Sequence, residues 1–240
     1  MARPRPWTVA SHRPLQRLAD GLWQVEADLD LLPIGRRMTI VRLTSGDLLV
    51  YGAVACDDAT MVAIDALGPV RWIVAPNGFH RMDAPAFASR YPDAKVVAPA
   101  GAKRRVAEVC RVDGGLDALP TDRVLGWEPC EGVPAEAVLS HRAGAETTII
   151  LNDSFMNLPS KLPGFKGWVV KAIGSTGGPK VTRTARLGLV KNKAAWAAHL
   201  RRLAATPGLT RVIPGHGEVI RDAAAAAEGL ARAGDGLHRG

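Results

Sequence analysis

Short apolar runs rich in β-branched residues alternate with helix-forming segments along the chain, and this alternation limits the fold more than any other feature. Such runs are typical of buried strands. The first half contains runs at 22–25, 38–44, 47–52, 70–76 and 95–99, and the second half contains runs at 135–141, 146–153 and 210–217. Strands that alternate with helices predict a fold of the α/β class.

The segments between these runs supply the helices and one hairpin. Runs 38–44 and 47–52 are separated only by Ser45 and Gly46, which suit a two-residue turn. Helical patterns cover 57–67, 83–91, 101–110, 192–205 and 222–233. Asp83 precedes Ala-Pro, and an Asp in this position favours a helix N-cap that accepts backbone N–H bonds. Residues 158–193 are rich in Gly and Pro and are interpreted mainly as a loop, with a short strand at 168–172.

Length and composition fit one folded unit. We expect a single domain over 1–240, with an N-terminal half at about 20–115 and a C-terminal half at about 120–235. The basic N-terminus lacks the apolar region of a signal peptide, and no apolar stretch is long enough for a membrane span, so we expect a cytoplasmic protein. Cys56, Cys110 and Cys130 are widely spaced, which is typical of free thiols.

The positive charge is concentrated in one part of the chain. The formal net charge is +8, and residues 154–217 contain many Lys and Arg but no Asp or Glu. A surface of one sign attracts anions such as carboxylates, phosphates or nucleic acid. A solvated face balanced by acidic residues elsewhere explains the pattern equally well.

Four chemically capable residues lie at or just after the ends of predicted strands. His141, Asp153 and His216 close their runs, and His80 lies four residues beyond the end of its run. In open α/β sheets, ligands bind beyond the carboxyl ends of the strands, so such residues can meet in one crevice. The other histidines lie outside this pattern and are interpreted as surface residues: His12, His199 and His238.

These motifs resemble the metallo-β-lactamase superfamily, in particular a small uncharacterised branch with a degenerate His-x-His-x-Asp-His motif. VIPGHGEVI, which contains His216, is similar to the last metal-ligand turn of the superfamily. ETTIILNDSF, which contains Asp153, is similar to the strand of the superfamily whose terminal Asp bridges two metal ions. His141, in SHRAGAETT, resembles the middle His of the superfamily, which precedes a turn of small residues and the strand that carries the Asp. The resemblance implies a four-layer αββα sandwich, with two mixed sheets packed face to face and helices outside.

The first metal motif departs from the family. If His80 is its final His, Ala75 and Asn77 stand at the first two His positions and Phe79 stands at the Asp position. In an alternative register His80 is the second His and Asp83 lies near the Asp. The resemblance then implies one zinc or other divalent ion held by His80, Asp153 and His216, with His141 as a fourth ligand or a general base, or no metal if the site is vestigial.

Three functions remain open. The first is a mononuclear metal-dependent hydrolase of an anionic substrate, with His141 and Asp153 catalytic and with Asn77, Lys161 and Lys166 contacting the substrate. The second is a non-catalytic binding protein of the same fold that has lost its metal site. The third is a nucleic-acid-binding relative that uses the basic segment 158–211. That segment offers few aromatic residues on which bases could stack.

Overall fold

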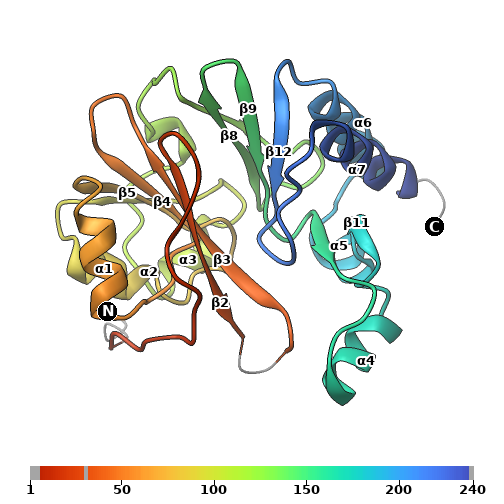
Figure 1. Ribbon diagram of the computed structural model, residues 1–240, viewed down its shortest axis with the longest axis horizontal. Coiled ribbons are helices and arrows are strands. Elements are labelled where there is room, and N and C mark those ends of the chain that lie inside the picture. Colours follow the sequence, from red (N-terminus) through yellow and green to blue (C-terminus); the bar gives the residue numbers. More distant parts are fainter. Residues whose placement is uncertain (1–5, 30–31, 238–240) are drawn as a thin grey trace. The chain divides into compact units, whose positions relative to one another are not determined.

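The computed structural model describes residues 6–29 and 32–237, and the chain forms two compact units. The first comprises Met1–Asp28 and Arg37–Gly126, and the second comprises Leu29–Arg36 and Trp127–Gly240. Each unit has its own mixed sheet and helices (Figure 1), so the predicted α/β class with two mixed sheets is confirmed. The single domain over 1–240 stays a prediction.

A six-stranded sheet in the order β1-β2-β3-β4-β5-β6 belongs to the first unit, although β3 begins in the second. β4 pairs with β3 antiparallel and with β5 parallel, and β5 pairs with β6 parallel. Parallel neighbours need crossover connections, and helices supply them here. The strands are β1 (Gln16–Ala19), β2 (Leu22–Asp28), β3 (Gly35–Arg42), β4 (Leu48–Tyr51), β5 (Val70–Val74) and β6 (Lys95–Val97). Sequence reasoning missed β1 alone among them.

The turn between β3 and β4 is longer than predicted. Leu43 N–H donates to the Asp47 carbonyl at 2.8 Å, and Gly46 N–H donates to the Leu43 carbonyl at 2.9 Å. Three residues therefore form the loop, and Gly46 adopts a φ of +89° at its end. Three-residue hairpin loops commonly end on a residue in this left-handed conformation, which Gly adopts without strain.

The helices of the first unit are α1 (Asp58–Asp65), α2 (Ala84–Arg90) and α3 (Lys103–Ala107), with a short 3-10 turn, η1, at Leu116–Ala118. α1 begins as predicted, since Asp57 accepts the Thr60 N–H at 2.8 Å. Asp83 is the N-cap residue of α2 as predicted, but its side chain forms no hydrogen bond that caps the helix. The carboxylate instead accepts the Ala55 N–H at 3.0 Å and so ties the segment after β4 to the start of the helix.

The second unit contains a four-stranded sheet in the order β12-β9-β8-β7. The strands are β7 (Leu125–Pro129), β8 (Ala137–Ala143), β9 (Glu146–Ile150) and β12 (Leu209–Ile213), of which β7 was not predicted. β9 is antiparallel to β8 and parallel to β12. α6 (Lys193–Ala204) and α7 (Ala223–Gly236) lie side by side next to β12 (Figure 1). They bury Trp196 and Leu230 in the core of this unit.

The prediction of a loop over 158–193 with a strand at 168–172 is wrong. Residues 156–188 hold β10 (Met156–Leu158), α4 (Gly164–Ala172), β11 (Gly178–Lys180) and α5 (Arg183–Gly188). Gly and Pro mark boundaries here, because Pro163 is the N-cap of α4 and Gly174 adopts a positive φ just after its end. Among the residues with described positions, no helix is both long enough and apolar enough to cross a membrane.

Candidate metal centre

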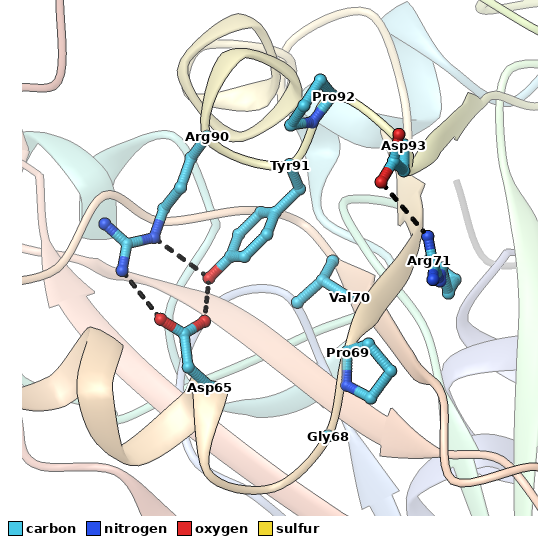
Figure 2. Close-up of a pocket in the computed structure, with 9 residues that line it drawn as sticks. All are labelled: Asp65, Gly68, Pro69, Val70, Arg71, Arg90, Tyr91, Pro92 and Asp93. Carbon is cyan, nitrogen blue, oxygen red and sulfur yellow. Dashed lines mark hydrogen bonds and ion pairs between the residues drawn. The ribbon is translucent and has the colours of Figure 1, made fainter.

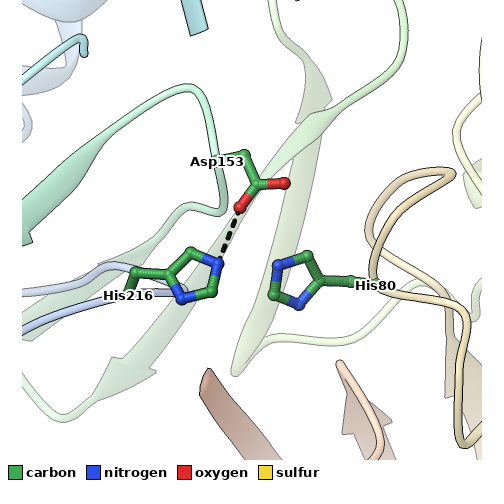
Figure 3. Close-up of side chains that lie close together, drawn as sticks. All are labelled: His80, Asp153 and His216. Atoms are coloured by element: carbon green, nitrogen blue, oxygen red, sulfur yellow. Dashed lines mark ion pairs between the residues drawn. The ribbon is translucent and has the colours of Figure 1, made fainter. Parts of the chain in front are cut away.

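Asp153 and His216 meet at one edge of the sheet in the second unit. β9 and β12 are parallel neighbours in which Ile150 pairs with Ile213, and the two side chains each lie three residues further along. Because parallel strands end at the same edge, both side chains come to one place. His216 Nε2 lies 3.1 Å from Asp153 Oδ1, and the side chains are only 6% and 11% exposed (Figure 3). The structure therefore brings together two of the predicted ligands within a single unit.

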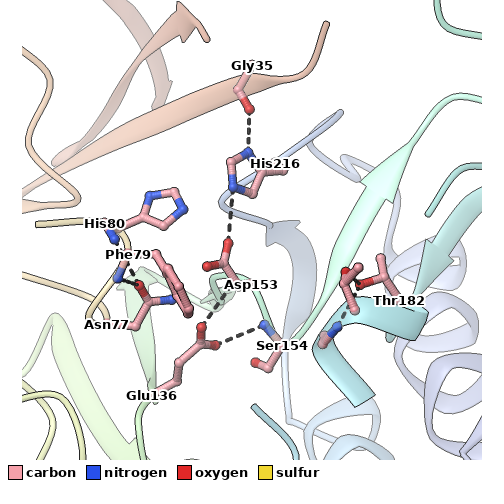
Figure 4. Close-up of polar contacts among 11 residues, drawn as sticks. Gly35, Asn77, Phe79, His80, Glu136, Asp153, Ser154, Thr182 and His216 are labelled. Carbon is pink, nitrogen blue, oxygen red and sulfur yellow. Dashed lines mark hydrogen bonds and ion pairs between the residues drawn. The ribbon is translucent and has the colours of Figure 1, made fainter. Parts of the chain in front are cut away.

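The other ring nitrogen of His216 determines what Nε2 can do. Nδ1 lies 2.6 Å from the Gly35 carbonyl oxygen, which can only accept a hydrogen bond, so we assign the proton to Nδ1 (Figure 4). In a neutral ring, Nε2 then directs a lone pair at a carboxylate oxygen. That contact is favourable only when a cation, either a proton or a metal ion, lies between them. A metal-bound His usually donates its other ring N–H to an oxygen acceptor such as a backbone carbonyl, as Nδ1 of His216 does here.

The two glycines beside His216 are required by close packing. A Cβ at Gly215 would lie 2.1 Å from Asn152 Oδ1, and a Cβ at Gly217 would lie 2.1 Å from the Asn157 carbonyl oxygen. Gly217 also has a φ of +86°. The Gly-His-Gly sequence thus lets the turn pack against the segment that follows β9, which holds the imidazole beside Asp153.

Glu136 is a buried carboxylate that sequence reasoning missed. It is 1% exposed, and it accepts the Asp153 N–H at 3.1 Å through Oε1 and the Ser154 N–H at 3.0 Å through Oε2 (Figure 4). Glu136 directly precedes β8, whose start lies beside the end of β9. The carboxylate therefore fixes the turn that carries Asp153. The sequence carried one indication of this role, because Glu136 lies within an apolar run, and an acidic residue that is buried with such a run almost always has a partner.

Cys130 lies near this carboxylate but is unsuited to metal binding. Burial, and then the negative charge of Glu136, raise the pKa of the Cys130 thiol well above its usual value. A thiol must lose its proton to become a good ligand. Cys130 is a free buried thiol, and Cys56 and Cys110 are free as well, as the sequence predicts.

His141 does not close its strand, which corrects the sequence prediction. It lies inside β8, is 1% exposed and pairs with Thr148 across the hairpin. Ile150, the last residue of β9, lies two positions or about 7 Å beyond Thr148 along the strand, and Asp153 lies beyond that end. The register therefore separates His141 from the Asp153–His216 pair. The role of His141 as a fourth ligand or a general base stays a prediction.

His80 lies in the first unit, in the turn after β5, and is half-buried. Asn77 Oδ1 accepts the N–H groups of Phe79 and His80 at 2.8 and 2.9 Å (Figure 4). Asn77 is 0% exposed and shapes this turn, and its contact with a substrate stays a prediction. Ala75, at the other missing His position, is buried in the core. Lys161 and Lys166 lie just before α4 and on it, and their contact with a substrate stays a prediction.

Two histidines predicted at the surface are structural instead. His199 is fully buried, accepts the Glu131 N–H at 3.0 Å through Nδ1 and contacts Trp196 edge-on. Burial lowers the pKa of His199 below its usual value. His12 accepts the Asp57 N–H at 3.0 Å, and its side chain is 6% exposed. Both rings lie where segments distant in sequence meet. His238 lies outside the described residues.

A surface depression in the first unit does not contain the predicted chemistry (Figure 2). It lies at the start of β5, whereas His80 follows the end of that strand. Asp65 accepts a 2.8 Å hydrogen bond from Arg90 and a 2.6 Å hydrogen bond from the Tyr91 hydroxyl. Burial, and then Asp65, raise the pKa of Tyr91 far above its usual value. The group is a neutralised structural network that joins α1 to the end of α2.

Known proteins resemble the chain in structure more than in sequence. A domain of unknown function, DUF4336, matches residues 19–102, and no curated protein matches. A metallo-β-lactamase of Hirschia baltica superposes with a TM-score of 0.60 at 14% identity, over 92% of this chain and 98% of that chain. The mono-zinc form of the metallo-β-lactamase FIM-1 of Pseudomonas aeruginosa superposes with a TM-score of 0.62 at 14% identity, over 95% of this chain and 96% of that chain. VMB-1 superposes with a TM-score of 0.62 at 12% identity, over 96% of this chain and 100% of that chain. The chain therefore has the metallo-β-lactamase fold.

Proposed function

We propose that the chain is a mononuclear metal-dependent hydrolase in which His80, Asp153 and His216 hold one divalent ion. The contact between His216 Nε2 and Asp153 Oδ1 carries this proposal, because the Nδ1 N–H donates to the Gly35 carbonyl, so Nε2 directs a lone pair at the carboxylate, a contact that a cation would stabilise. Resemblance to the last two ligand motifs of the superfamily supports it. One relative in fold, FIM-1, is known in a mono-zinc form.

The donor set has the chemistry that zinc prefers. Two imidazoles and one carboxylate match the three protein ligands of many catalytic zinc sites, which keep one position open for water. We assign the third ligand to His80, because Asn77 fixes the backbone of its turn and the sequence places it after a strand of the first sheet. The Gly35 carbonyl and Glu136 would support His216 and Asp153 from behind.

The proposed reaction is hydrolysis of an ester, an amide or a phosphoester. A divalent ion in such a site supplies Lewis acidity and lowers the pKa of a coordinated water to about 7. Because His141 lies away from this edge of the sheet, we assign proton transfer to Asp153 through Oδ2, the oxygen that does not face His216. The acid-free segment 154–217, which joins Asp153 to His216 in sequence, favours an anionic substrate.

Metal binding is tested on protein purified without a His tag and stripped with a chelator. Titration with zinc in a calorimeter should give one site, and H80A, D153N and H216A should each weaken binding by about a hundredfold or more. D20N removes a carboxylate that is 89% exposed and should leave the affinity unchanged. Binding of less than about a tenth of an equivalent would refute the metal site. Unchanged affinity in H80A would refute the three-ligand assignment.

Hydrolysis is tested on the zinc-loaded protein with p-nitrophenyl esters and bis(p-nitrophenyl) phosphate. We expect turnover of at least one probe, which D153N and H216A abolish and D20N retains. Zinc binding at one site without turnover of any probe would contradict the hydrolase and favour the non-catalytic binding protein. Because affinity and turnover are measured separately, failure of one is distinguishable from failure of the other.

A further inference from the structure

Helix α4 exposes an apolar face that the proposed hydrolase does not use. Phe165 is 77% exposed and Trp168 is 63% exposed, and Ile173, just after the helix, is 43% exposed. Residues three apart lie on one side of a helix, so Phe165 and Trp168 form a single stripe. The opposite side is anchored, because Gly167 and Val170 are buried. Exposed large apolar groups gathered in this way mark an interaction site.

This stripe lies among exposed cations. Lys161, Lys166 and Lys171 are all exposed, and no Asp or Glu occurs between 154 and 217. Within the part of the chain that the structure describes, Lys161 and Lys171 form no ion pair. Figure 1 shows α4 at the end of the second unit that is remote from β9 and β12. The helix thus presents aromatic rings and lysines together on a projecting part of this unit.

We propose that α4 docks on the surface of an anionic lipid bilayer. Helices that lie in a membrane interface combine a Trp- and Phe-bearing face with lysines, which attract anionic headgroups. Phe165 and Trp168 would insert at the level of the headgroups, as aromatic rings do at bilayer interfaces. The lysines around them would contact lipid phosphates. The proposal does not depend on metal binding or on catalysis.

Two other occupants fit the stripe less well. Single-stranded nucleic acid binds by stacking bases on aromatic faces. Here the two rings stack on each other, with centroids 5.8 Å apart and planes inclined by 21°, which occupies the faces between them. A second copy of this helix would bring Lys161, Lys166 and Lys171 against the same charges on its partner, and like charges repel across an interface.

The test is co-sedimentation of the full-length protein, stripped of metal, with two kinds of vesicle. One kind contains equal parts phosphatidylcholine and phosphatidylglycerol, and the other contains phosphatidylcholine alone. We expect the wild type to bind the anionic vesicles at low salt. The affinity should be at least tenfold weaker in F165A/W168A, and in K161Q/K166Q/K171Q it should fall about fivefold for each lysine removed. V62A is the matched control, because Val62 is 66% exposed on α1 of the other unit, and it should bind like the wild type.

A spectroscopic measurement reports on insertion directly. Brominated lipids in the anionic vesicles should quench part of the tryptophan fluorescence of the wild type. W168F keeps an aromatic ring, so it should still bind but should lose that quenched part. Circular dichroism checks that every variant is folded.

Three results would overturn the proposal. The first is the absence of binding to anionic vesicles at low salt by the wild type. The second is binding that F165A/W168A leaves unchanged. The third is a wild type that does not bind vesicles but binds an oligonucleotide or self-associates in sedimentation velocity, when F165A/W168A loses that activity. This result would assign the stripe to nucleic acid or to a second copy.

Discussion

Replacement of Glu136 by Gln tests whether this buried carboxylate holds Asp153 in place. Glu136 accepts the backbone N–H groups of Asp153 and Ser154 with its two oxygens, at 3.1 and 3.0 Å. Gln has almost the same shape but offers only one oxygen. Its NH2 group would face the second backbone N–H, so one donor would be left buried without an acceptor.

The magnitude follows from these two contacts. A hydrogen bond to a charged group contributes about 1.5–3 kcal/mol, and an unpaired buried donor costs about 1–3 kcal/mol. These effects overlap, so we expect E136Q to lower the free energy of unfolding of the metal-free protein by about 2–4 kcal/mol. Because the turn that carries Asp153 loosens, zinc affinity should fall about 10- to 100-fold.

Urea unfolding followed by tryptophan fluorescence measures the stability, and calorimetric titration measures zinc binding. E228Q is the matched control, because the Glu228 side chain is 67% exposed and pairs with Arg232 on the surface of α7, so its loss should cost less than about 1 kcal/mol. If E136Q matched the wild type within about 0.5 kcal/mol or exceeded it, the desolvation of Glu136 and its repulsion with Asp153 would outweigh the two hydrogen bonds. The positioning role would then be refuted.

Two further predictions concern the turn of His216 and the buried His199. G217A should destabilise the chain by at least about 2 kcal/mol, because the new Cβ would meet the Asn157 carbonyl at 2.1 Å and φ is +86°; wild-type stability in urea would contradict this packing. For His199, the folded-state pKa is lowered, so the unfolded chain binds a proton first on acidification. The stability that this ring contributes is therefore complete above about pH 6.5 and falls as the pH drops towards the lowered pKa, whereas H199N should lose this dependence. Urea midpoints at several pH values measure it, and equal slopes in both proteins would refute the assignment.

The sequence by itself determined the α/β class, most of the strands and the pair Asp153 and His216. Apolar runs and their end points are local features, and β9 and β12 were expected before their pairing was known. Since both runs end in a polar residue with metal-binding chemistry, parallel pairing alone was enough to bring these residues together. Asp57 also caps α1 at the start of the helical pattern that the sequence predicts over 57–67.

Only the tertiary structure decided the rest, because it depends on strand register and on contacts between distant segments. The pairing of His141 with Thr148 separates His141 from Asp153, although both residues close predicted apolar runs in the sequence. Glu136 acquires its partners 17 and 18 residues later, which no local pattern indicates. Helix α4 was missed because the segment around it is rich in Gly and Pro, and the exposure of its Phe165 and Trp168 is the basis of its proposed role at a lipid surface.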